Sequence, residues 1–516
     1  MAYFYLVLLY LGFGGSLLLL GTSSIPRLAA LRKPMAATTV TLVTLVWGLS
    51  PQAGRWVLSV WTPSSVTGGW LVLDTDPALW WSVLAILATF TGVLWVTVGE
   101  RSNDLAFTGT LALVYLTVVW LVMTSGSLLL TLAMWATIDI IWFLVRLTDT
   151  ADGERVVWAA AVGGGASVLL WIISLFLLTE GTSGLWWLMR PSSSLTILLT
   201  VAGAMRMGLY PFQVVHAETW GYSRVLTLAS ALSPLTGISL LYRLLAMPMG
   251  QSIPAWFVTW AAISMLWLGV KALMHQGRAA VLPAAYGLLL AVVTGAVVGE
   301  DARGLAIGAG VWVAGLGVLA LARRYHRRTY AWTWPTIVGL LTLVGAPPSP
   351  LFRLYCSVFA NTPWWLQVVS GLGLMFSIAS LVRGVTVKAP VRVGAPSPFS
   401  WLPMAAGFGI LTAVLAGMSW VYPVTGVPAP EMALWATACL GGLALAFWGG
   451  RLRISWGEAR AVLEIADLKW LYRSTLQGTT NLLSVVRAAA EVVEGRGSIL
   501  WSIVILLLVL MLVGYR

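Results

Sequence analysis

The sequence carries little charge for its length. Of its 516 residues, only 9% are Asp, Glu, Lys or Arg, whereas 59% are hydrophobic and the mean hydropathy is +0.89. Soluble domains carry about 25% charged residues, so a water-soluble globule is excluded. The chain is predicted to be an all-α polytopic membrane protein, which crosses the bilayer many times.

Cysteine and histidine are also scarce, which limits the cofactors that the chain could hold. The two cysteines, Cys356 and Cys439, are too few for a four-ligand zinc site or an iron–sulfur cluster. The three histidines fall near the ends of predicted helices and not in the mid-membrane pairs that a bis-histidine haem needs. Phosphate-binding loops, nucleophile elbows and metalloprotease motifs are missing. We therefore expect no cofactor, no metal and no catalytic site of the chain's own.

Apolar runs long enough to cross about 30 Å of hydrocarbon recur along the whole chain. They do not show the alternation over about ten residues that marks the strands of a membrane barrel, so that fold is excluded. The runs predict sixteen membrane-spanning helices, over residues 3–21, 36–50, 78–98, 105–123, 125–145, 156–178, 193–215, 225–245, 254–274, 279–299, 304–322, 331–350, 363–382, 400–420, 431–450 and 498–515.

Most of the positive charge lies on one set of loops between these spans. With sixteen spans, 23 of the 30 Lys and Arg fall on one side and five on the other. The positive-inside rule makes the first side cytoplasmic, so both termini are expected on the outer side of the inner (plasma) membrane. The net charge of +12 then reflects topology and contact with the anionic lipid bilayer, and no nucleic-acid partner is expected.

Three ionisable residues that are not counted with the loops lie within the predicted spans or near their margins: Asp139, Arg206 and Arg353. An unpaired charge at that depth costs several kcal/mol, so each of the three is a candidate functional residue. The residues alone leave two interpretations open, which are a role in ion conduction and a structural ion pair.

The stretch GAMRMGLYPFQ (203–213) resembles the seventh helix of the antiporter-like, proton-conducting subunits of respiratory complex I, membrane-bound hydrogenases and multisubunit Na+/H+ antiporters. In that family a lysine stands five residues before a Pro-Phe-His motif, and here Arg206 stands five residues before Pro211. Four more segments resemble, in order, the family's strand-like approach to its third helix, its fifth helix, the basic loop before its tenth helix and its twelfth helix: LVLDTDPALWW (71–81), SLLLTLAMWAT (127–137), KALMHQGRAAVLPAAY (271–286) and LVGAPPSPLFRLY (343–355).

The resemblance implies a polar chain across the bilayer centre, made in the family by a glutamate on helix five and lysines on helices seven, eight and twelve. Most of these positions are changed here. The glutamate, the lysines of helices eight and twelve and the motif's histidine correspond to Thr137, Leu235, Tyr355 and Gln213. The cation of helix seven remains as Arg206, but arginine stays protonated at any accessible pH and cannot shuttle a proton. We expect it to be a permanent counter-charge to Asp139.

Prolines predict breaks in helices seven and twelve, as in the family, at Pro211, Pro347, Pro348 and Pro350. Water would enter at such breaks. The candidate ion pathway comprises Asp139, Arg206, Tyr210, His216, Glu218, Lys271, Tyr286, Arg353 and Tyr355. Arg353 also fits a cation that reaches the outer surface.

The C-terminal segment from 456 to 496 alternates apolar and charged faces and has no continuous apolar run, which is typical of a helix lying on the membrane surface. It resembles the cytoplasmic lateral amphipathic helix of the larger antiporter-like subunits, and residues 497–516 resemble their terminal anchor. An ordinary amphipathic connector is the alternative. The remaining chain divides into N-terminal helices (1–104), an antiporter-like core (105–400) and C-terminal helices (401–455).

Two functions follow. The first is a membrane-arm subunit of a complex-I-like or hydrogenase-like assembly, with other membrane subunits as partners and with proton translocation weakened by the loss of central Lys and Glu residues. The second is an ion transporter proper: an H+ channel, a Na+/H+ antiporter subunit or the membrane half of a two-component inorganic-carbon uptake system. The depleted central charges favour the first. An enzyme with its own active site is disfavoured by the missing motifs.

Overall fold

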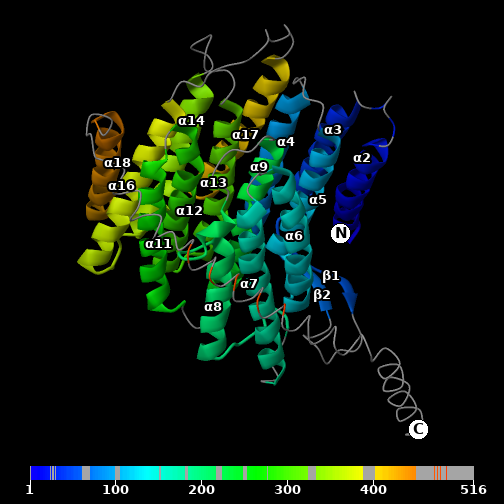
Figure 1. Ribbon diagram of the computed structural model, residues 1–516, viewed down its shortest axis with the longest axis horizontal. Coiled ribbons are helices and arrows are strands. Elements are labelled where there is room, and N and C mark those ends of the chain that lie inside the picture. Colours follow the sequence, from blue (N-terminus) through cyan, green and yellow to red (C-terminus); the bar gives the residue numbers. More distant parts are fainter. Residues whose placement is uncertain are drawn as a thin grey trace. The chain divides into compact units, whose positions relative to one another are not determined.

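The computed structural model describes residues 2–23, 25, 28, 31–60, 70–98, 105–149, 153–179, 184–216, 224–247, 253–275, 277–322, 333–386 and 401–448, together with 470, 474, 477, 481 and 484. The chain divides into two compact units, Met1–Arg453 and Ile454–Arg516. The first unit is a bundle of helices with one two-stranded hairpin (Figure 1).

The helices of the first unit have these bounds: α1 Ala2–Leu9, α2 Gly15–Ser23, α3 Arg32–Gly48, α4 Pro77–Val98, α5 Leu105–Thr124, α6 Leu128–Asp149, α7 Gly153–Thr179, α8 Ser193–Met207, α9 Arg224–Ala231, α10 Ser233–Leu245, α11 Ala255–Met274, α12 Val281–Val298, α13 Ala302–Ala322, α14 Thr333–Val344, α15 Pro350–Ser357, α16 Trp364–Thr386, α17 Trp401–Val421 and α18 Ala429–Trp448. A π-helical turn, Tyr10–Gly14, joins α1 to α2, and 3-10 turns lie at Gln213–Val215 and Gly277–Ala280.

Within the described residues, eight helices are long and apolar enough to cross a membrane, and five shorter apolar helices accompany them. The prediction of an all-α, multi-pass membrane fold is therefore confirmed. The predicted number of sixteen spans stays a prediction, because the last of them (498–515) lies outside the described residues.

Three predicted spans differ from the helices that the structure contains. The span 193–215 is too long, because α8 ends at Met207, where Gly208 takes a left-handed conformation with φ +72°. The span 225–245 is divided into α9 and α10, which meet at Leu232.

The third difference is the span 331–350, which is also too long. The α14 helix ends at Val344 and is followed by Gly345 at φ +74°. Pro347 and Pro348 lie in the non-helical connection, and Pro350 begins α15, whose N-cap Ser349 accepts a hydrogen bond from the backbone N–H of Leu351. Proline at the first position of a helix costs no backbone hydrogen bond, so the chain starts a new helix there.

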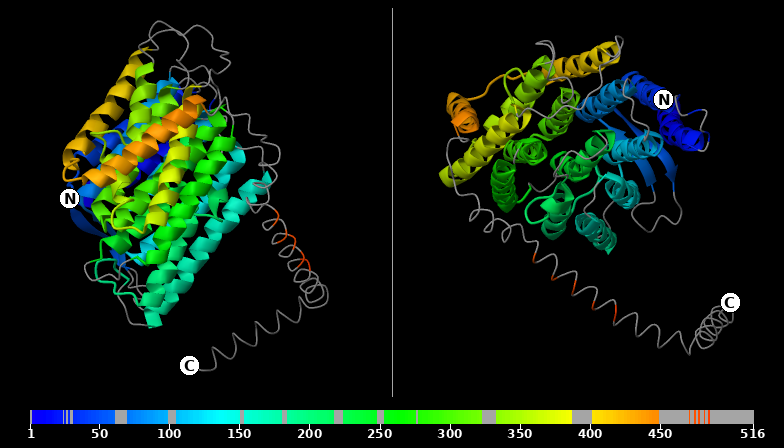
Figure 2. Two further views of the ribbon diagram at one scale, coloured as in Figure 1. Left: turned by 90° about the vertical axis from the view of Figure 1, so that its left-hand side faces the viewer. Right: turned by 45° about the horizontal axis from the view of Figure 1, so that its top comes forward.

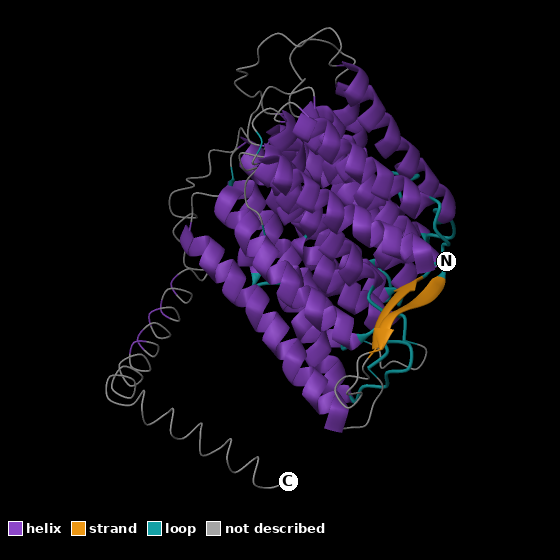
Figure 3. Ribbon diagram, turned by 90° about the vertical axis from the view of Figure 1, so that its right-hand side faces the viewer, coloured by secondary structure: helices purple, strands orange, loops and turns teal. Residues whose placement is uncertain are grey.

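The hairpin pairs β1 (Gly54–Val60) with β2 (Trp70–Thr75) in antiparallel register, and Arg55 lies opposite Asp74. The strand-like character of 71–81 is thus found in its first half, but the sequence analysis did not predict β1. Single bridges join Leu73 to Ser125 and Ser127 to Leu185, so the hairpin covers the end of the bundle where α5 meets α6. We call this the hairpin end; Figure 3 shows the strands at the edge of the helical bundle.

The centre of the bundle is formed by α12 and α13. In these helices 94% and 89% of the most apolar segment is buried, compared with 17% in α18. Figure 2 shows α18 at the edge of the bundle. Helices at the centre approach closely through glycine: a Cβ on Gly295 of α12 would lie 1.8 Å from the carbonyl oxygen of Leu354 in α15. The break that precedes α15 is therefore held against the central helix by backbone contact.

The second unit contributes five described residues, Trp470, Ser474, Gln477, Asn481 and Ser484, which are all helical and exposed. Their spacing of three and four places them on one face of a helix. The rest of the predicted lateral helix (456–496) and the predicted anchor (497–516) lie outside the described residues.

Candidate functional site

Arg206 is the most deeply buried cation among the sequence-predicted site residues. It occupies the last turn of α8, one residue before the helix ends, and only 3% of its surface is exposed. The left-handed Gly208 ends the helix directly after it, and no Cβ would fit there, because it would lie 2.6 Å from Nε2 of His216. The conformation of one glycine thus fixes where the helix stops and where the guanidinium is held.

The guanidinium of Arg206 has partners on two neighbouring helices. Nη1 donates to Oδ1 of Asp139 in α6, which makes the ion pair that the sequence analysis predicted. Nη2 donates to the carbonyl oxygen of Trp135 at 3.1 Å and to Oγ of Ser167 in α7 at 3.0 Å. Ser167 in turn donates to Oδ2 of Asp139 at 2.6 Å, which closes the network.

Aromatic and small residues complete the enclosure of this ion pair. The Trp135 ring lies 4.6 Å from Cζ of Arg206, within the range of a cation–π contact. On the α7 side a Cβ on Gly163 would lie 3.1 Å from both Arg206 Nη1 and Asp139 Oδ1. Any larger residue at this position would press on both charged groups, whereas glycine lets them meet against α7 without displacement.

The ion pair is unequally exposed. The side chain of Arg206 is 4% exposed and that of Asp139 is 21% exposed. Arginine keeps its charge at any accessible pH, and the carboxylate is held by both Arg206 and Ser167. The arrangement can therefore hold a fixed positive charge in the bundle but does not offer a lysine-type group that gains and loses a proton.

A second group of predicted residues lies just beyond the end of α8. His216 is buried, its ring stacks on Tyr286 of α12 at 4.1 Å between centroids, and its Nε2 lies 2.6 Å from the carbonyl oxygen of Met207. Tyr115 of α5, which the sequence analysis did not single out, is also fully buried. The buried ring of His216 therefore lies against the residue that follows Arg206, with Tyr286 stacked on its face.

Tyr210 and Lys271 are both half-buried. The backbone N–H of Tyr210 donates to Oγ of Ser264 at 3.0 Å, and its carbonyl accepts from the indole of Trp260, so α11 holds the segment that contains Pro211. Lys271 occupies the last turn of α11, and its carbonyl lies 2.8 Å from Nδ1 of His275. Glu218 lies outside the described residues.

Arg353 and Tyr355 lie on α15 and do not join this network in the described part of the chain. Arg353 is exposed and lies 5.1 Å over the ring of Tyr422, beside a cavity of about 490 Å³ that Asp301 also lines. Tyr355 is buried and donates to the carbonyl oxygen of Leu343 at 2.8 Å. The hydroxyl of Tyr355 thus joins α15 to the end of α14.

One buried cation was missed from the sequence. Arg243 lies near the end of the predicted span 225–245 and was not among the candidate residues, but the structure places it in α10 with 7% of its surface exposed, paired with Asp74 at 2.8 Å. A cation in the last turn of an apolar helix looks like a loop residue, so only the acid at position 74 could have indicated the pair. Among the described residues, no group of three or more His, Cys, Asp or Glu side chains gathers in a way that would hold a metal ion.

No protein-family model and no curated protein matches the sequence. Solved structures are nevertheless similar in fold. A chain of the Mrp complex from Dietzia sp. DQ12-45-1b superposes with a TM-score of 0.67 at 16% identity, over 99% of this chain and 62% of that chain. The present chain therefore spans about three fifths of the length of its Mrp counterpart.

Two further structures match along their whole length. A chain of the membrane-bound sulfane sulfur reductase, an archaeal respiratory membrane complex, gives a TM-score of 0.66 at 14% identity, over 98% of this chain and 100% of that chain. A chain of respiratory complex I from Thermus thermophilus gives 0.63 at 16% identity, over 86% and 100%. The chain has the antiporter-like fold that these membrane subunits share.

Because Gly163 lies close to both charged groups, a methyl group added at this position should affect the stability of the protein. Gly163→Ala should lower the stability of the protein by about 1–3 kcal/mol, because the added Cβ presses on the Arg206–Asp139 contact. The matched control is Gly164→Ala, since a Cβ there meets nothing within 4 Å. The stability of both variants is compared by their apparent melting temperatures in detergent. Equal values would contradict the close contact of Gly163 with Arg206 and Asp139.

The coupling within the ion pair can be measured by a double-mutant cycle. Arg206→Ala should destabilise the protein by about 3–5 kcal/mol, because Asp139 is left without its counter-charge. Removing both groups by adding Asp139→Ala should recover part of this loss. Arg353→Ala, which removes an exposed arginine, serves as the control and should have little effect. Simple additivity of the two single variants would show that the pair contributes no coupling energy.

Proposed function

We propose that this chain is a membrane-arm subunit of a multisubunit complex of the complex-I-like or hydrogenase-like kind, in which proton translocation is weakened. The similar chains come from the Mrp complex, an archaeal respiratory membrane complex and respiratory complex I, which supports a place among other membrane subunits. The charge distribution of the loops supports an inner-membrane location with both termini outside.

The proposal that proton translocation is weakened rests on the ion pair between Arg206 and Asp139. A proton path of the kind that the resemblance implies needs groups whose charge changes as protons pass. Arg206 cannot lose its proton, and Thr137, Leu235 and Tyr355 stand at positions where such groups are expected. The buried centre therefore keeps a constant charge, while the scaffold of the fold is retained.

The C-terminal unit supports an assembly role. Its five described residues form one exposed helical face that includes Trp470, which is 54% exposed. We propose that the segment 456–496 contacts neighbouring subunits and that 497–516 anchors it in the membrane.

Purification from native membranes tests the assembly. A tagged chain extracted in mild detergent should bring down other multi-pass membrane proteins in fixed ratio, because a membrane-arm subunit is buried on its sides by its neighbours. Removal of residues 454–516 should reduce this recovery without unfolding Met1–Arg453, which is compact by itself. Recovery as a stable monomer with full transport activity would contradict the proposal and favour the ion transporter.

A conservative replacement tests the weakened conduction. Arg206→Lys keeps the charge but introduces a group whose pKa falls on burial, so it restores the titratable chemistry at one position. We expect no rise in proton flux in reconstituted vesicles, because the other titratable positions are still missing. A rise in flux, not seen with the control Arg353→Lys, would show that Arg206 lies in a working path and that the chain conducts H+ or exchanges it for Na+.

A further inference from the structure

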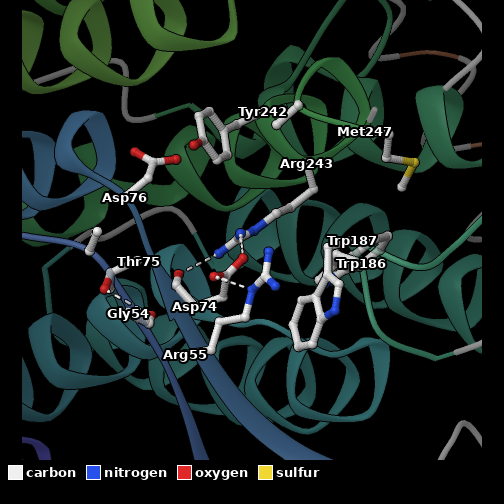
Figure 4. A pocket seen from close by; sticks show the side chains of 12 residues that line it. Gly54, Arg55, Asp74, Thr75, Asp76, Trp186, Trp187, Tyr242, Arg243 and Met247 are labelled. Carbon is white, nitrogen blue, oxygen red and sulfur yellow. Dashed lines mark hydrogen bonds and ion pairs between the residues drawn. The ribbon is translucent and has the colours of Figure 1, made fainter. Parts of the chain in front are cut away.

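A second charged site lies at the hairpin end, apart from the Arg206 network. A cavity of about 580 Å³ opens there between the hairpin, the segment that carries Trp186 and Trp187, and the end of α10. Figure 4 shows the side chains of Arg55 and Arg243 on either side of Asp74, with the Trp187 ring beside Arg55. None of these residues belongs to the candidate ion pathway, so the cavity needs its own explanation.

The carboxylate of Asp74 is fully engaged by the two arginines. Oδ2 accepts from Nη1 of Arg243 at 2.8 Å, and Oδ1 accepts from Nε of Arg55 at 3.3 Å. Nη2 of Arg243 donates to the backbone carbonyls of Asp74 at 2.9 Å and Met123 at 3.3 Å. Arg243 is thus fixed in place by the hairpin and by the end of α5, and two guanidinium charges face one carboxylate.

Donors remain after these contacts are counted. Nε of Arg243 is buried and has no hydrogen-bond partner, and the Arg243 side chain as a whole is 8% exposed. Arg55 uses only Nε among the described residues, so its two terminal nitrogens are left for another acceptor. The guanidinium of Arg55 lies 4.2 Å over the Trp187 ring, within the range of a cation–π contact, and both residues line the cavity.

The other acid of the cavity does not cancel this excess of donors. Asp76 already accepts from the backbone N–H of Leu79 at 2.9 Å, at the start of α4. Burial raises the pKa of its carboxyl above the usual value. The unused donors of Arg55 and Arg243 therefore outnumber the free acceptors that the described hydrogen bonds leave in the cavity, which favours an anionic partner.

We propose that this cavity binds a phosphate-type oxyanion between Arg55 and Arg243, supplied either by free phosphate or by the headgroup of a phospholipid. Arginine presents planar pairs of N–H groups that match the oxygens of phosphate, and charge-assisted bonds of this kind are strong. The cavity volume of about 580 Å³ is larger than a phosphate ion needs. It could therefore also hold the glycerol that is attached to the phosphate of a phospholipid. The site goes beyond the proposed function and does not depend on it.

Binding to the delipidated protein in detergent tests the site, with thermal unfolding and calorimetry as readouts. The probes are sodium phosphate against sodium chloride at equal ionic strength, and dihexanoyl phosphatidylglycerol against dihexanoyl glycerol below their micelle concentrations. Phosphate or the phospholipid should stabilise the protein, and Arg55→Gln should weaken that binding at least about tenfold. Arg55 is 56% exposed, so its replacement leaves the buried Arg243–Asp74 pair intact.

Two further variants sharpen the result. Arg55→Lys keeps the charge but loses the planar pair of donors, so it should retain part of the affinity. Arg190→Gln removes another exposed arginine that does not line the cavity, and it should bind like the unaltered protein. Stabilisation by phospholipid alone identifies a headgroup, and stabilisation by both probes or by phosphate alone identifies a free oxyanion. Binding of neither probe, or equal losses in Arg55→Gln and Arg190→Gln, would overturn the proposal.

Discussion

A permanent positive charge in an apolar bundle must have a carboxylate within reach, and the rest of the site depends on this requirement. Arg206 cannot escape it by losing a proton, as a buried lysine would. The bundle meets it with three helices: α8 supplies the cation, α6 the carboxylate, and α7 a hydroxyl that bonds to both. Desolvation makes such a pair costly to break, whatever its net contribution to stability.

The backbone is adapted to that pair at two glycines. Gly163 lets α7 approach the charged groups, and Gly208 ends α8 directly behind the arginine. Because α8 stops there, the carbonyl oxygen of Met207 has no partner within the helix. It lies within hydrogen-bond distance of Nε2 of His216 instead. The position of His216 beside the residue that follows Arg206 is thus set by where one helix ends.

The ion pair could be predicted from sequence because Asp139 was the only acid in the interior of a predicted span and had to lie near a cation. The ends of α8 and α14 were harder to predict, since hydropathy continues through Gly208 and Gly345 although the backbone there leaves the helix. The strand β1 and the burial of Arg243 could not be predicted, because both depend on a pairing between residues far apart in the chain, Arg55 and Arg243 with Asp74.

The two ion pairs lie on one closely packed pair of helices. Arg206 belongs to α8 and Arg243 to α10, and these helices meet where a Cβ on Gly237 would lie 2.5 Å from the carbonyl oxygen of Gly203. The two backbones are in direct contact there, with no side chain between them. We therefore expect α8 and α10 to move together. That unit is tied to α6 and α7 through Asp139 and Ser167, and to the hairpin through Asp74. A proton path that relied on relative movement of these helices would have to break the Arg206–Asp139 or the Arg243–Asp74 contact. We therefore expect the helices to keep their arrangement.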